Sequence, residues 1–171
     1  MTCCDLDTYV GLFKSIRHLL NRRSFSFHPR RTVTDFEQAS MTAIRQAFGD
    51  HVLSGCNFHF AQAIKRKIDK LSLRKTYDSD LNFIEFIRFI ELLQYVPIED
   101  YSTALKFINK AYGLYPFFYT VEERKTISRL MIYLSSTWFQ ESARYPPSLW
   151  NNFGNNLSKV IFSAPTFRFL L

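Results

Sequence analysis

The chain has 171 residues, of which 47% are hydrophobic and 22% are charged, so it can fold around a core and is not a disordered tail. Only 5 residues are Gly, and neither GxxxxGK[ST] nor GxGxxG occurs, which excludes the common phosphate-binding loops. Lys and Arg outnumber Asp and Glu by 22 to 15, and the resulting net charge of +7 favours a polyanionic partner such as a nucleic acid.

Cysteine content and targeting signals indicate a reducing compartment, the cytoplasm or the nucleus. Cys3, Cys4 and Cys56 are too few and too unevenly spaced for a disulfide framework. The N-terminal segment MTCCDLDTYV lacks the basic and apolar regions of a signal peptide. No apolar run reaches the roughly 18 residues that cross a bilayer. We therefore expect no membrane partner, and the oligomeric state stays unknown.

The first half of the chain predicts alternating helices and strands. Apolar residues at three- and four-residue steps predict a helix over 5–21, which a basic connector joins to a short strand over 31–34. A helix over 36–48 follows, with a capping box from Thr34 to Glu37. A second strand over 51–56 and a third helix that extends to about residue 72 complete a β-α-β-α order. This order is typical of a parallel strand pair in an α/β sheet.

The second half predicts helices alone. Helical periodicity covers 80–95, 99–112 and 121–138, and Thr120 with Glu123 forms a second capping box. The final stretch from residue 153 has no helical period although it ends in bulky apolar residues, and a two-stranded element is one expectation for it. The expected fold class is α/β followed by an all-α region, helix-dominated overall.

One acidic residue, Asp35, stands where a strand ends and a helix begins. Open α/β sheets place ligand and metal sites at this edge, and a carboxylate there could hold Mg²⁺. The plainer interpretation is an acid that suits the dipole of the following helix, because one carboxylate makes no metal site by itself. Both interpretations stay open.

Cys56 and His59 have the spacing of half a zinc site. A structural zinc ion needs about four ligands, and the other Cys and His residues form no second close pair at finger spacing. Those residues are Cys3, Cys4, His18, His28 and His51. A buried cysteine beside a histidine at a helix start is the alternative.

Two basic clusters are candidates for nucleic-acid binding. The denser one comprises Lys65, Arg66, Lys67, Lys70, Arg74 and Lys75. Its four-residue repeat places Arg66, Lys70 and Arg74 on one helix face, which either neutralises phosphates or forms a solvated surface. A second cluster, Arg22, Arg23, Arg30 and Arg31, precedes Asp35, and DNA binding is favoured if the strands bring both clusters to one rim. No GxSxG pattern supports a nucleophile triad.

Several of these motifs, taken in order, resemble the transposase domain of Mutator-like elements over about residues 8–152. The resemblance is carried by Thr34-Asp35-Phe36-Glu37, Gly55-Cys56-Asn57-Phe58-His59 and Arg66-Lys67-Ile68, with landmarks at Thr8-Tyr9, Leu12-Phe13, Ile16, Ala39, Gln62, Leu73, Tyr77, Asp80, Val96-Pro97, Thr137-Trp138, Pro147 and Trp150-Asn151. It implies a partial RNase H-like region over 1–76, a helical insertion over 77–152 and a divergent tail over 153–171. It also implies that an intact family member uses Asp, Asp and Glu to hold two Mg²⁺ or Mn²⁺ ions for DNA cleavage and joining.

This sequence departs from the family pattern at two of the three metal ligands. The resemblance assigns Asp35 to the second Asp, and Cys56 with His59 to the family's C-x-x-H signature. The first Asp belongs to a strand upstream of the helix over 5–21. The third metal ligand of the family, a Glu, belongs after Trp150-Asn151 and follows an Asn-Asn pair. If Asn155-Asn156 is that pair, Lys159 stands where the Glu would be. Asp35 would therefore hold a metal only if other residues supplied the missing ligands.

The resemblance and its departures predict a truncated, catalytically inactive fragment of a cut-and-paste DNA transposase. The alternative is a domesticated DNA- or protein-binding module that keeps the basic face, with Lys65, Arg66, Lys70 and Arg74 on the DNA. A third possibility is a nuclease that a second chain completes by supplying the missing acids.

Overall fold

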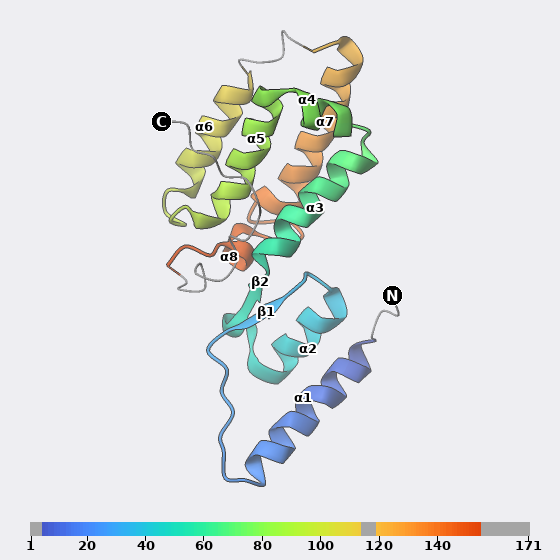
Figure 1. Cartoon of the computed structure of the whole chain (residues 1–171). Coiled ribbons are helices and arrows are strands. Elements are labelled where there is room, and N and C mark those ends of the chain that lie inside the picture. Colours follow the sequence, from blue (N-terminus) through green and yellow to red (C-terminus); the bar gives the residue numbers. More distant parts are fainter. Residues whose placement is uncertain (1–4, 114–118, 155–171) are drawn as a thin grey trace.

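Helices dominate the computed structural model, which describes residues 5–113 and 119–154 (Figure 1). The N-terminal part contains α1 (Leu6–Asn21), β1 (Thr32–Thr34), α2 (Gln38–Phe48), a 3₁₀ turn (Asp50–Val52) and β2 (Leu53–Gly55). The helical part contains α3 (Asn57–Lys70), α4 (Arg74–Ser79), α5 (Leu81–Leu92), a 3₁₀ turn (Leu93–Tyr95), α6 (Tyr101–Gly113), α7 (Val121–Leu134), a π-helical turn (Ser135–Phe139) and α8 (Pro147–Trp150). The prediction of a helix-dominated chain is confirmed.

The two strands form a parallel pair, as the β-α-β-α order predicts. Thr32 lies opposite Leu53 and Thr34 opposite Gly55. Within the described residues this sheet has two strands, and α2 provides the crossover between them. Both strands are only three residues long, so their pairing depends on the helices that cover them. The RNase H-like fold stays a prediction.

Of the two capping boxes that the sequence predicts, one is present in the structure and one is absent. Thr120 and Glu123 form the reciprocal capping box at the start of α7. The predicted box from Thr34 to Glu37 is absent, because α2 begins at Gln38 and Glu37 is its cap residue with no side-chain capping bond. The backbone of Thr34 belongs to the strand ladder and cannot also open a helix. The Glu37 carboxylate instead accepts a 2.6 Å hydrogen bond from the Tyr9 hydroxyl.

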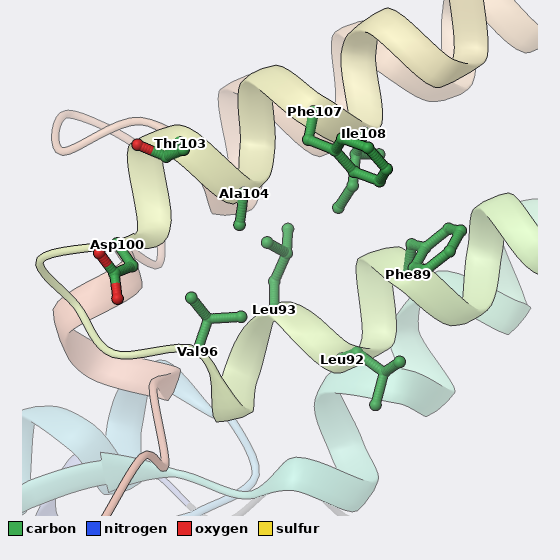
Figure 2. A pocket seen from close by; sticks show the side chains of 9 residues that line it. All are labelled: Phe89, Leu92, Leu93, Val96, Asp100, Thr103, Ala104, Phe107 and Ile108. Carbon is green, nitrogen blue, oxygen red and sulfur yellow. The ribbon is translucent and has the colours of Figure 1, made fainter.

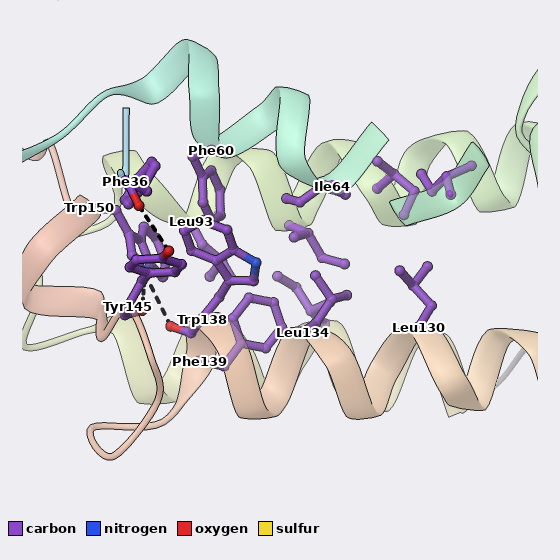
Figure 3. Close-up of a cluster of buried hydrophobic side chains, with 14 of the residues drawn as sticks. Phe36, Phe60, Ile64, Leu93, Leu130, Leu134, Trp138, Phe139, Tyr145 and Trp150 are labelled. Carbon is purple, nitrogen blue, oxygen red and sulfur yellow. Dashed lines mark hydrogen bonds between the residues drawn. The ribbon is translucent and has the colours of Figure 1, made fainter. Parts of the chain in front are cut away.

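An aromatic core joins the N-terminal part to the helices (Figure 3). Phe60 of α3 stacks on Trp150 of α8 with 4.5 Å between ring centroids, and Trp138 meets Phe60 edge-on at 5.0 Å. The Trp150 indole N–H donates to the backbone carbonyls of Trp138 and Tyr145, both at 3.1 Å. Phe36, which follows β1, packs edge-on against Trp138 at 4.9 Å. The expected boundary between 76 and 77 therefore crosses one continuous core.

Two sequence expectations fall on residues outside those that the structure describes. One is the two-stranded element in the tail, since 155–171 are not among the described residues. The other is the contribution of Cys3 and Cys4 to a zinc site. Among the helices that are described, none is long and apolar enough to cross a membrane.

Candidate functional site

A cleft of about 340 Å³ lies where the carboxyl end of β1 meets α3 and the π-helical turn. Asp35, His59 and Arg66, all singled out in the sequence, line it. Its remaining lining residues are Phe36, Ala63, Tyr133, Thr137, Trp138, Arg144 and Tyr145. The fold thus gathers three predicted site residues with a second arginine around one cleft.

Asp35 is positioned by the residue that follows it. Phe36 has a φ of 71°, which is rare for a residue with a side chain, and its ring is buried against Trp138 and Tyr145. The Tyr145 hydroxyl donates a 2.9 Å hydrogen bond to the Phe36 carbonyl and holds this turn in place. Asp35 remains exposed, and its carboxylate accepts from the backbone N–H of Glu37 at 3.3 Å.

Gly55 makes room for this arrangement at the end of β2. A Cβ atom at Gly55 would lie 2.3 Å from the Phe36 ring, well inside contact distance. The glycine is therefore required by close approach, and it links the two motifs that the sequence places on either side of α2. The Phe36 ring can cover β2 only because position 55 has no side chain.

His59 lies in the first turn of α3 and lines the cleft, whereas Cys56 stands at the N-cap position of that helix without a side-chain capping bond. The Cys56 backbone N–H donates to the Thr34 carbonyl at 2.8 Å, which fixes the start of α3 against β1. The His59 Nδ1 atom is buried and has no hydrogen-bond partner among the described residues. Burying such a nitrogen without a partner is unfavourable.

No other residue in the described part of the chain completes a zinc site with Cys56 and His59. Within it, no group of three His, Cys, Asp or Glu side chains is close enough to hold a metal ion. Cys56 is a half-buried free thiol and is not among the residues that line the cleft. The structure therefore places the histidine of the C-x-x-H signature toward the cleft and leaves its cysteine beside the strand.

The two arginines give the cleft a positive charge. Arg66 is exposed and hydrogen-bonds to the Gln62 side chain one turn earlier on α3. Arg144 is also exposed and lies over the Tyr145 ring, 5.4 Å from its centroid. In the described structure neither forms a salt bridge with an acid. Two guanidinium groups against the single Asp35 carboxylate favour an anionic ligand.

The prediction that Arg66, Lys70 and Arg74 share one helix face is wrong for Arg74, because α3 ends at Lys70. The chain then turns through Ser72, whose φ is 57°, and Arg74 belongs to α4. Arg74 pairs with Asp69 at 2.8 Å and with Asp78 at 3.9 Å. Lys65 turns to α5, where its ammonium group lies 3.6 Å from the Glu91 carboxylate. Lys70 is exposed at the end of α3.

The second basic cluster does not join the first on one rim. Arg31 is half-buried and donates to the Ser54 hydroxyl at 2.7 Å and to the Asn152 side chain, and its burial lowers the pKa of the guanidinium. Arg22 and Arg23 follow α1, whose C-terminal end lies at the opposite end of the molecule from α4 and α6 (Figure 1). Arg31 therefore serves the fold near the junction of the two parts.

Four residues of the cleft were missed in the sequence: Ala63, Tyr133, Arg144 and Tyr145. Thr137 and Trp138 were visible only as a landmark of the family resemblance. They lie in a π-helical turn, a feature that is often found at functional sites. The predicted helix over 121–138 thus ends as an α-helix at Leu134 and widens into the turn that closes the cleft.

Comparisons of the chain with protein-family models, with curated proteins and with solved structures give no significant match. The family resemblance stays a prediction from the motifs.

Proposed function

We propose that this chain is a transposase-derived DNA-binding domain that takes a backbone phosphate in the cleft between Asp35, His59, Arg66 and Arg144. The observation that supports it most is the convergence of Asp35 with His59 and Arg66. These residues come from separate motifs, and the fold places them on one cleft with a further arginine. A Mutator-like transposase origin accounts for the same motifs in the same order.

The chemistry of the lining residues suits a phosphodiester. Guanidinium groups form paired, charge-assisted hydrogen bonds with phosphate oxygens, and Arg66 and Arg144 are both free of acidic partners in the described structure. His59 lines the same cleft beside them. Because such contacts are blind to base sequence, binding is expected to depend steeply on salt.

Strand cleavage is not part of the proposed function of this chain alone. Two-metal catalysis holds its ions about 3.5–4 Å apart with a cluster of carboxylates. Asp35 is the single carboxylate among the residues that line the cleft, so these residues do not fit a two-metal centre. We expect no nicking of supercoiled DNA with Mg²⁺ or Mn²⁺. Metal-dependent nicking that disappears in Asp35→Ala would contradict this expectation.

A charge-matched pair of variants tests the binding site. Arg66→Ala/Arg144→Ala removes two positive charges from the cleft, whereas Lys106→Ala/Arg124→Ala removes two exposed charges elsewhere, on α6 and α7. Duplex DNA binding is measured from about 50 to 200 mM salt, where each phosphate contact contributes about 0.9 to the log–log slope.

The cleft variant is expected to bind DNA more weakly and to flatten the slope by roughly 1 unit, because the contact with the one phosphate in the cleft is lost. The control variant should keep most of the wild-type slope. Equal losses in both variants would show that overall charge, and not the cleft, attracts DNA. Wild-type binding that is undetectable at about 50 mM salt would contradict DNA binding by this chain.

A further inference from the structure

An apolar groove runs between α5 and α6, away from the cleft (Figure 2). Its volume is about 530 Å³. Its apolar side chains are those of Phe89, Leu92, Leu93, Val96, Ala104, Phe107 and Ile108. Two polar residues, Asp100 and Thr103, lie at the end of the groove where α6 begins.

The groove leaves large apolar side chains in contact with solvent. Phe107 is 61% exposed and Leu92, which also lines the groove, is 50% exposed. Isolated exposed apolar residues are ordinary, but a hollow lined by several of them gains free energy when another apolar group fills it. The proposed DNA site makes no use of this groove.

The last described residues lead the chain to the edge of the groove. The Asn151 side chain donates a 2.8 Å hydrogen bond to the carbonyl of Val96, a residue that lines the groove. The Asn152 backbone N–H donates to the Gln94 carbonyl at 2.6 Å. The chain therefore passes Val96 immediately before residue 155, with two hydrogen bonds that hold it there.

The sequence that follows has the composition to fill the groove. Residues 155–171 contain the apolar run Val160, Ile161 and Phe162, with Leu157 just before it. Lys159 is the single charged residue between Gly154 and Arg168, and Asp100 offers an exposed carboxylate at the rim.

The length of this sequence is also sufficient. From Asp100 to Ile108 the groove follows eight residue steps of α6, about 12 Å at the rise of a helix. Extended chain spans about 3.3 Å per residue, so roughly four residues cover that distance. The segment from 157 to 162 meets this requirement and begins within a few residues of Asn152.

We propose that residues 157–162 dock in the groove between α5 and α6 of their own chain, with Lys159 facing Asp100. The segment would cover Phe107 and tie the end of α8 to α6. This inference is independent of the proposed DNA binding.

Photocrosslinking in the full chain tests the contact directly. Phe107→p-benzoylphenylalanine places a reactive ring in the groove, and Ile132→p-benzoylphenylalanine places the same ring on the exposed face of α7 as a control. The Phe107 probe should crosslink within one chain to the tryptic peptides that end at Lys159 and Arg168, and the Ile132 probe should not. Crosslinks between two chains, or none to these peptides, would overturn the proposal.

A second measurement avoids any change to the groove. Ile161→Asp/Phe162→Asp alters the docking segment, and Phe169→Asp/Leu170→Asp makes the same change farther along the chain. The first variant should bind more of the apolar dye bis-ANS than the wild-type chain, because the groove opens, while the second should bind as the wild-type chain does. Equal dye binding by both variants would contradict docking by residues 157–162.

Discussion

The helices α1 and α5 are both amphipathic, yet they are held in very different ways. No residue of α1 is buried. Its contacts with α2 include an edge-on ring pair, Phe13 with Phe48 at 5.4 Å, and a 3.2 Å hydrogen bond from Arg17 to the Ala47 carbonyl. In α5, by contrast, Phe83, Phe86, Ile87 and Ile90 are all buried in the common core.

The difference between α1 and α5 shows that amphipathic periodicity predicts where a helix forms but not its local stability. Local stability follows the apolar contacts that an element makes. Helix α1, which buries no residue, is therefore expected to exchange its amide hydrogens faster than α3, α5 and α7. The cleft lies at the junction of the two parts, since Asp35 belongs to the N-terminal part and His59, Arg66 and Arg144 belong to the helical part.

The largest expected effect comes from breaking the core at this junction. Trp150→Ala removes a fully buried ring that stacks on Phe60 and donates to two backbone carbonyls. We expect it to lower the free energy of unfolding by about 3–5 kcal/mol. Chemical denaturation measures this loss. Ile132→Ala, at a position 68% exposed, is the control and should change stability by less than about 0.5 kcal/mol.

Two glycines offer a sharper test of the N-terminal part. Gly55→Ala sets a Cβ atom 2.3 Å from the Phe36 ring and should destabilise the chain by about 1–3 kcal/mol through overpacking. Gly11→Ala meets nothing within 4 Å in the middle of α1 and should stabilise that helix by up to about 1 kcal/mol. Opposite signs in denaturation experiments would confirm the close approach at Gly55. A neutral Gly55→Ala would contradict it.

Much of the fold could be predicted from local signals. The expected helix over 5–21 is α1 within one residue, the Thr120–Glu123 capping box is present, and the two strands pair in parallel. The wrong predictions occur where the spacing of residues fits a local motif but the backbone has a different conformation. Thr34 fits a capping box by spacing, but its backbone is used by the strand. The spacing of Arg66, Lys70 and Arg74 fits one helix, but Ser72 turns the chain between the last two.

The cleft was only partly predictable, for a different physical reason. Asp35, His59 and Arg66 stand out because they belong to short local motifs. Arg144 has no such motif, and it reaches the cleft because Tyr145 bonds to the Phe36 carbonyl, 109 residues away in the sequence. A contact of that range depends on packing, which no local pattern encodes.

A smaller effect is expected inside the helical part. Thr120→Ala removes the hydroxyl that caps α7, and it should cost about 1 kcal/mol, the typical value for losing an N-cap. Because α7 also buries Ile127, Leu130 and Leu134, the loss should be confined to faster amide exchange in its first turn. Exchange that rises equally in α1 and α2 would show that the N-terminal and helical parts open together, and would contradict the expected difference in their local stability.

The smallest expected effect is a change in pH dependence within the same part. Glu91 of α5 has a side chain only 22% exposed, and burial raises the pKa of its carboxyl, while the charges of Lys65 and Arg88 lower it in part. The folded chain therefore holds this proton at pH values where the unfolded chain has released it. The stabilising contribution is complete below the ordinary pKa of 4.5 and is lost as the pH rises through the raised value.

Glu91→Gln removes this titration, so the variant should gain stability relative to the wild-type chain as the pH rises from about 4 to about 8. The difference in unfolding free energy between the two chains, measured by denaturation at each pH, shows the gain without interference from other groups that titrate equally in both. Glu85→Gln on the exposed side of α5 removes one charge from the same helix and measures the general effect of that loss. A gain no larger at Glu91 than at Glu85 would mean that the Lys65 ion pair fully offsets the burial of the carboxylate. In that case the strong packing of α5 would impose no electrostatic penalty on the helical part.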